Sequence, residues 1–145
     1  MKLLKDILYK ARIVEVFGST NIAITALSFD SRKIEKDSLF IAIKGTQSDG
    51  HKYIDDTIAK GAIAILCEDL PSTINPKVTY VKVPSTSSAL GIAASNFYDN
   101  PSETIKLVGV TGTNGKTTTV TLLFNLFRKL GYKAGLLSTV KNQIN

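Results

Sequence analysis

The sequence predicts an α/β fold, with a small N-terminal α/β domain followed by the first βαβ unit of a second domain. Short apolar runs alternate with helical patterns through the first hundred residues, as they do in α/β sheets. The polar run Asp99-Asn100-Pro101-Ser102 is the clearest break in the pattern. We therefore expect two domains, at residues 1–98 and 99–145. Beyond the break, a glycine-rich turn at 109–119 lies between an apolar run and an amphipathic stretch.

The elements of the first domain are expected in a regular order. Residues 2–10 favour a short helix, and 13–17 and 24–29 favour strands that end in polar turns. Residues 38–43 form a short apolar strand that leads into the polar segment 44–50. Asp49 is placed to cap a helix from about His51 to Lys60. Strands at 63–67 and 78–83 follow, and then a helix from Ser85 to Tyr98.

The second domain begins with the apolar run 105–108, which we expect to be a strand. After the turn, the apolar residues of 120–130 fall on one helical face, and Gly131 is the residue type favoured just past a helix C-terminus. Residues 134–140 are expected to form the next strand, which completes one βαβ unit.

The glycine-rich turn predicts a site for a nucleoside triphosphate. A strand, a glycine-rich turn and a helix N-terminus in that order form a loop whose backbone N–H groups hold phosphate oxygens. Lys116 adds a positive charge beside the outer phosphates, and the Thr117 hydroxyl can bind Mg²⁺. The usual pattern G-x-x-x-x-G-K-[ST] is not met strictly, because Val110 stands at its first position and the glycine is Gly109. The alternative is an ordinary strand-to-helix turn, which the flanking strand and helix patterns disfavour.

Composition and charge limit the class of protein. The 145 residues are 43% hydrophobic, with neither a membrane-spanning run nor a secretory pattern. The single cysteine, Cys67, excludes an internal disulfide and lies in an apolar run, so we expect a buried side chain in a cytoplasmic protein. The net charge of +6 lies entirely in residues 104–145. A nucleic-acid surface is the less favoured explanation, because no basic cluster has interleaved aromatic residues.

The sequence after Glu103 contains no acidic residue. An enzyme with a phosphate loop normally needs a downstream carboxylate to hold Mg²⁺ or its water. Such a domain also needs more than two strands to bury its sheet. We therefore expect these residues to be part of a longer protein.

Two polar turns of the first domain follow strand ends, where α/β folds bind ligands. They are Asp30-Ser31-Arg32 and the segment 45–50. They could hydrogen-bond a polar ligand, or they could be ordinary turns that bond their own backbone, which general physics slightly favours. His51, the one histidine, is expected to be structural, and no residues have metal-ligand spacing.

Two runs of the sequence resemble the Mur ligase family: Phe97–Ser102, and Leu107–Thr119 with its Thr-Asn-Gly-Lys-Thr core. The polar turns and the phosphate loop come in that family's order, so the resemblance covers the whole chain. The Tyr-x-x-Pro-Ser run favours the branch that adds a diamino acid to UDP-N-acetylmuramoyl-dipeptide over its neighbour MurF. Members of the family have three domains, for the UDP end of the substrate, for ATP and for the incoming amino acid.

The resemblance implies roles for individual residues. The uridine site would consist of Phe29, Ser31, Thr46, Gln47 and Ser48, although Phe29 replaces a common leucine and Thr46 a histidine found in some members. ATP would be bound by Gly112, Thr113, Asn114, Gly115, Lys116, Thr117 and Thr118. Lys116 would be the catalytic residue, and Thr117 would hold Mg²⁺. The partners would be UDP-N-acetylmuramoyl-L-alanyl-D-glutamate and a diamino acid, either meso-diaminopimelate or lysine, with no nucleic acid or membrane, and the protein would be a monomer.

The resemblance also implies a mechanism, in which phosphorylation of the substrate carboxylate by ATP gives an acyl phosphate that an amino group then attacks. These residues alone are expected to be inactive. The alternatives are another Mur ligase such as MurF, a non-catalytic nucleotide-binding module, and a phosphate-loop kinase or GTPase. A preference for GTP over ATP would count against the ligase.

Overall fold

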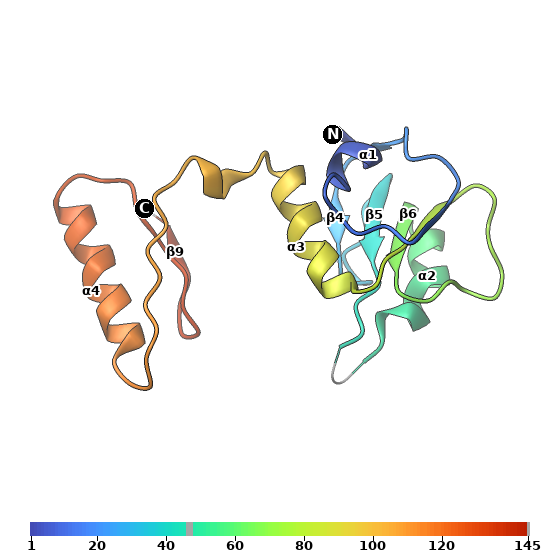
Figure 1. Cartoon of the computed structure of the whole chain (residues 1–145). Helices are drawn as coiled ribbons and strands as arrows, with labels where there is room; N and C mark the ends of the chain where they lie inside the picture. The colour runs from blue at the N-terminus through green and yellow to red at the C-terminus, as the bar shows by residue number, and fades with distance from the viewer. Residues whose placement is uncertain (46–47, 145) are drawn as a thin grey trace. The chain divides into compact units, whose positions relative to one another are not determined.

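The computed structural model describes residues 1–45 and 48–144, which form two compact units (Figure 1). The first unit is Met1–Ile105 and the second is Lys106–Asn145. The division follows the short 3₁₀ helix η2 (Pro101–Glu103), a few residues after the break at which the sequence predicts a domain boundary. No helix in the described ranges is long and apolar enough to cross a bilayer.

The first unit is built on a five-stranded sheet in the order β2-β7-β6-β5-β4. The parallel strands are β4 (Leu27–Ser28), β5 (Ser38–Ile41), β6 (Ala62–Cys67) and β7 (Thr79–Lys82). At the edge, β2 (Glu15–Phe17) pairs antiparallel with β7. The α/β prediction is therefore confirmed for this unit.

Helices cover both faces of this sheet. Successive residues of a strand point to opposite faces, so each strand packs against the helices on both sides. On one face Leu39, Ile41 and Leu66 pack with α1 (Leu4–Ile7) and α3 (Thr86–Phe97). On the other face Phe40 and Ile65 pack with Ile54 of α2 (Ile54–Ala59), which follows the 3₁₀ helix η1 (Gly50–Tyr53) (Figure 1). These strands are buried on both faces, which explains their nearly continuous apolar sequence.

The helix starts agree with the expected caps. The Asp49 carboxylate accepts a hydrogen bond from the His51 N–H at 3.0 Å, and η1 and α2 cover most of the expected helix. The Ser85 hydroxyl accepts one from the Ser88 N–H at the start of α3. Cys67 is fully buried, as predicted.

Two expectations for the first unit are wrong in detail. The helix at 2–10 shortens to α1, because β1 (Lys2–Leu3) pairs with β3 (Ala23–Ile24). The strand at 24–29 divides into β3 and β4, which belong to different sheets. The Thr25 hydroxyl donates to the Lys36 carbonyl at 2.6 Å and the Thr25 N–H to the Asp37 carbonyl, so this residue is held outside both ladders.

The second unit contains α4 (Lys116–Lys129) and the antiparallel pair β8 (Gly135–Leu136) and β9 (Gln143–Ile144). Gly131 ends the helix as predicted, at φ 84°, and the Tyr132 N–H donates to the Phe127 carbonyl.

The strand expected at 105–108 does not form, and the one expected at 134–140 is reduced to β8. A strand needs a partner for its backbone groups, and β8 pairs with β9 in a hairpin rather than with residues 105–108. Leu107 and Val108 are exposed. Of the expected βαβ unit, this unit therefore contains the helix and one short strand.

Candidate functional site

The first candidate site lies at one edge of the five-stranded sheet. Because β4 to β7 are parallel, their carboxyl ends share this edge, where open α/β sheets bind ligands. Polar residues follow each of these strands, namely Asp30, Lys44, Glu68 and Ser85.

In the turn after β4, Arg32 is engaged by Asp30. The Asp30 carboxylate accepts hydrogen bonds from the Arg32 guanidinium at 2.9 and 2.8 Å and from the Arg32 N–H at 3.0 Å. These bonds hold the pKa of the Asp30 carboxyl well below its usual range and raise the pKa of Arg32. Ser31 lies in the same turn, and its carbonyl accepts a hydrogen bond from the Lys60 ammonium at 3.0 Å.

Phe29 presents its ring to solvent from this turn. The side chain is 64% exposed and lines an open hollow of about 460 Å³ with Leu27, Ser28, Asp30, Lys33 and Glu35. An exposed aromatic ring beside a hollow can stack on a planar ligand group such as a nucleotide base. This geometry fits the role in uridine binding that the resemblance implies for Phe29.

After β5, Lys44 and Gly45 pair with Ser48 and Asp49, and these four residues are called the hairpin. Lys44 and Asp49 form an isolated antiparallel bridge, and the Gly45 N–H donates to the Ser48 carbonyl at 3.0 Å. The Ser48 hydroxyl is exposed and lies 3.1 Å from the Tyr53 hydroxyl. Thr46 and Gln47, which sequence reasoning places in the uridine site, lie outside the described residues. Within the described ranges, no hydrogen bond or ion pair joins Phe29 or Ser31 to Ser48.

A side-chain network joins this hairpin to the ends of β6 and β7. His51 Nδ1 lies 2.7 Å from the Asp49 carboxylate, and His51 Nε2 accepts the Glu68 N–H at 2.9 Å. The Glu68 carboxylate accepts the Thr86 N–H at 2.8 Å and the Thr86 hydroxyl at 3.0 Å. The Thr86 N–H above all lowers the pKa of Glu68. His51 is thus structural, as expected, but sequence reasoning missed Glu68 and Thr86, although polar residues at the ends of two strands were a usable signal.

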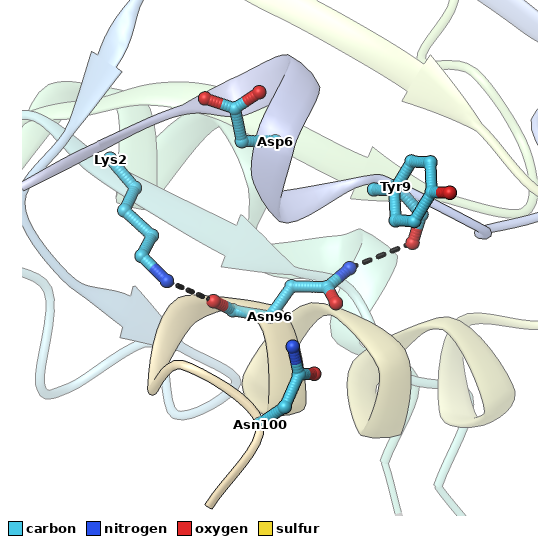
Figure 2. Close-up of a pocket in the computed structure, with 5 residues that line it drawn as sticks. All are labelled: Lys2, Asp6, Tyr9, Asn96 and Asn100. Carbon is cyan, nitrogen blue, oxygen red and sulfur yellow. Dashed lines mark hydrogen bonds between the residues drawn. The ribbon is translucent and has the colours of Figure 1, made fainter.

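A second hollow of the first unit lies between α1 and α3 (Figure 2). The Asn96 amide donates to the Tyr9 carbonyl at 2.7 Å (Figure 2). It also donates to the Ile7 carbonyl at 2.9 Å. The Lys2 ammonium donates to the Asn96 carbonyl and to the Asp99 carboxylate. These bonds attach α1 to the end of α3, so the polar groups here serve the fold.

The phosphate-binding turn is the candidate site of the second unit. Gly112 has φ 149° and Gly115 has φ 77°, conformations that other residues rarely adopt. Among the described residues, no hydrogen bond engages the backbone N–H of any residue from Thr113 to Thr118. Successive unengaged N–H groups at a helix N-terminus are donors that an anion can use, and the helix dipole favours negative charge there.

Lys116 and Thr117 occupy the first turn of α4, where sequence reasoning placed them. The Lys116 ammonium donates to the carbonyls of Gly112 and Thr113, so the cation closes over the turn. The turn thus fits the phosphates of a nucleotide, with N–H donors, one cation and one hydroxyl at Thr117. Thr117 is the residue that sequence reasoning expects to bind Mg²⁺, and the described residues contain no cluster of three or more His, Cys, Asp or Glu placed for a metal.

Comparisons with known proteins identify the family of the chain. Residues 23–98 match the Mur ligase family, catalytic domain. The chain belongs to the Mur ligase family. It is 58% identical over 142 residues to the UDP-N-acetylmuramoyl-L-alanyl-D-glutamate–2,6-diaminopimelate ligase of Cytophaga hutchinsonii, and 53% identical to the enzyme of the same name from Bacteroides fragilis.

These matches cover nearly all of the chain but only part of the relatives. The chain is covered to 97% and 98%, whereas it spans 29% of each relative's length. A solved structure of a UDP-N-acetylmuramoyl-L-alanyl-D-glutamate–2,6-diaminopimelate ligase matches 99% of the chain at 25% identity with a TM-score of 0.74, and the match covers 28% of that structure. The MurF ligase of Thermotoga maritima in complex with ADP matches 71% of the chain at 30% identity with a TM-score of 0.56, and the match covers 23% of that structure.

Proposed function

We propose that this chain is the N-terminal part of an ATP-dependent ligase that joins 2,6-diaminopimelate to UDP-N-acetylmuramoyl-L-alanyl-D-glutamate in peptidoglycan synthesis. The observation that carries the proposal is the match, over nearly the whole chain, to relatives of that name at 58% and 53% identity. The names of the relatives favour diaminopimelate over lysine. The buried single cysteine is compatible with a cytoplasmic protein, and we propose that it acts as a monomer.

MurF activity is the second candidate within the family. Solved MurF structures match 71 to 74% of the chain, with TM-scores of 0.56 to 0.57. The diaminopimelate ligase structure matches 99% of the chain with a TM-score of 0.74, which favours the diamino acid as the added group.

The first unit would bind the UDP end of the substrate. Phe29 would stack on the uracil ring, and Ser31 and Ser48 would supply hydroxyls, together with Thr46 and Gln47. Because Asp30 already neutralises Arg32, we assign uridine recognition to stacking and neutral hydrogen bonds rather than to this cation.

The second unit would bind ATP through the unengaged N–H groups from Thr113 to Thr118. A carboxylate has no good leaving group. Forming an amide from it therefore requires that it first be phosphorylated to an acyl phosphate. In that step charge builds on the transferred phosphoryl group, and Lys116 would stabilise it by leaving the carbonyls of Gly112 and Thr113. Mg²⁺ would supply further charge neutralisation, with the Thr117 hydroxyl as one ligand.

Calorimetric titration of the chain with UDP-N-acetylmuramoyl-L-alanyl-D-glutamate tests the first assignment. We expect saturable binding that Phe29→Ala and Ser31→Ala each weaken by roughly tenfold, about 1.4 kcal/mol. Ser87→Ala, at an exposed position of α3, is the control and should bind like the wild type. Absence of binding by a chain with the expected circular dichroism would overturn the assignment.

Titration with MgADP tests the second assignment. Lys116→Ala should lose at least about tenfold in affinity, because the mutation removes the cation from the phosphate site. Lys129→Ala, at the other end of α4, is the matched control. Tighter binding of GDP than of ADP would contradict the ligase proposal.

A further inference from the structure

The open hollow beside Phe29 has two charged side chains on its wall that the uridine assignment does not use. Lys33 and Glu35 both line this hollow, together with the exposed Phe29 ring. Among the described residues, no hydrogen bond or ion pair engages the Lys33 ammonium or the Glu35 carboxylate. An aromatic ring, an ammonium and a carboxylate therefore line one space, and both charged groups are available to a ligand.

The backbone that carries the two charged side chains is held at both ends. The Lys33 N–H donates to the Asp30 carbonyl at 2.9 Å. Further along the segment, the Thr25 hydroxyl donates to the Lys36 carbonyl at 2.6 Å. Between the two charged residues, Ile34 packs against the core, whereas its neighbours on either side are exposed. The charges are thus presented from ordered backbone, so a ligand that meets them has only side chains to immobilise.

Within this turn, Lys33 is the cation that can meet a phosphate. Its neighbour Arg32 is already bonded to the Asp30 carboxylate through two nitrogen atoms, at 2.9 and 2.8 Å. That ion pair also neutralises Asp30, which would otherwise repel an anion in the hollow. An ammonium forms charge-assisted hydrogen bonds with phosphate oxygens, which are stronger than those of neutral donors. The turn therefore offers one unengaged cation beside an exposed ring.

Glu35 has the wrong charge for a phosphate but suits the hydroxyl groups of a sugar. An ionised carboxylate only accepts hydrogen bonds, and acidic side chains bind the ribose hydroxyls of dinucleotides in this way. In the described part of the chain, Lys33 and Glu35 form no ion pair with each other, so different groups of one ligand can meet them. A nucleoside diphosphate has three suitable groups, namely a planar base, a ribose diol and a diphosphate.

We propose that the hollow beside Phe29 binds the nucleoside diphosphate part of the substrate, with Lys33 on the diphosphate and Glu35 on the ribose hydroxyls. This inference rests on the proposed function of the first unit. It adds two ligand-binding residues to those that the family resemblance implies. It also makes the site selective for ribose over deoxyribose.

The role of Lys33 is tested by NMR titration of the chain with UDP and with uridine. Lys33→Gln should weaken binding of UDP by roughly tenfold, because a charge-assisted hydrogen bond is lost, and should leave binding of uridine unchanged. Lys36→Gln makes the same change at an exposed lysine of the same segment that does not line the hollow. This control should bind both ligands like the wild type.

The role of Glu35 is tested with UDP and 2′-deoxyuridine diphosphate. The wild type should prefer UDP by roughly tenfold, and Glu35→Ala should bind the two equally, because the partner of the 2′-hydroxyl is removed. Glu15→Ala is the control and should keep the preference, since Glu15 lies in β2, at the opposite edge of the sheet from β4.

The outcomes separate this inference from the proposed function on which it rests. Undiminished UDP affinity in Lys33→Gln, an equal loss of UDP and uridine affinity, or a ribose preference that survives in Glu35→Ala would overturn the inference. If UDP-N-acetylmuramoyl-L-alanyl-D-glutamate still bound the wild type, the proposed function would stand. Absence of nucleotide-sugar binding by a folded chain would overturn the proposed function, and the roles of Lys33 and Glu35 with it.

Discussion

Gly50 and Gly91 should respond in opposite directions to the same substitution, alanine. Gly50 begins η1, and a Cβ added there would lie 2.8 Å from the Ile43 nitrogen, 2.9 Å from the Ile43 oxygen and 3.1 Å from the Ala42 carbonyl carbon. All three are backbone atoms, which cannot rotate away as the end of a side chain can. Gly91 lies within α3, and beyond its own helix backbone nothing is within 4 Å of the position that an alanine methyl would take.

The magnitudes follow from these distances. Relief of the closest contact at Gly50 to an ordinary 3.4 Å needs a backbone shift of about 0.6 Å. Overpacking of this kind costs about 1–3 kcal/mol, and loss of the Gly50 N–H bond to Ile43 adds about 1 kcal/mol. Gly91→Ala should stabilise by about 0.5–1 kcal/mol, because alanine loses less backbone entropy in a helix.

Urea unfolding followed by circular dichroism measures both effects. We expect Gly50→Ala to lower the free energy of unfolding by roughly 2–4 kcal/mol, and Gly91→Ala to raise it. Gly50→Ala should also weaken binding of the nucleotide sugar, since the hairpin that contains Ser48 must move. If Gly50→Ala unfolded within about 0.5 kcal/mol of the wild type, the close packing of the hairpin on Ile43 would be refuted.

Three further predictions test other contacts. Gly115→Ala and Gly131→Ala should each lower the free energy of unfolding by about 1–2 kcal/mol, since both glycines have positive φ and open space around them. Only Gly115→Ala should also weaken MgADP binding. The free energy of unfolding of Glu68→Gln should fall less steeply with falling pH than that of Glu103→Gln. The pKa of Glu68 is lowered by Thr86, so its contribution is present above the ordinary value of 4.5 and is lost as the pH falls through the folded-state pKa. Burial raises the pKa of the Cys67 thiol to about 11, so iodoacetamide at about pH 8 should modify it in urea but not in the native chain, as mass spectrometry would show.

The elements that sequence reasoning found are those whose signal is local. The strand β6 and the helix α3 are long enough for an apolar run or a helical repeat, and Ser85 marks the start of the helix. The two-residue strands β1 and β9 have no such signal, because each exists only through its partner. The run 105–108 shows the converse, since an apolar strand pattern does not form a strand where no neighbour pairs with it.

The candidate sites divide in the same way. The phosphate loop is contiguous, so its glycines, lysine and threonine could be read directly from residues 109–119. The His51 ring accepts backbone N–H groups from residues 17 and 18 positions away in the sequence. A backbone N–H is common to nearly all residue types, so the sequence does not indicate which ones the ring contacts. Sequence reasoning could therefore name His51 as structural, but it could not identify Glu68 and Asp69 as its partners.

The two units use backbone N–H groups at the ends of their elements in different ways, and this difference accounts for the different ligands proposed for them. In the first unit the N–H groups of His51, Glu68 and Thr86 are already bonded to side chains, so the edge is preorganised and presents a ring and hydroxyls. In the second unit the N–H groups from Thr113 to Thr118 are unengaged among the described residues, and the nearby cation is bonded only to carbonyls. Exchanging those carbonyls for phosphate oxygens gives Lys116 a charged partner, which strengthens its hydrogen bonds. The stacking-based site proposed for the first unit and the anion site proposed for the second would thus both be consequences of how each unit satisfies its own backbone.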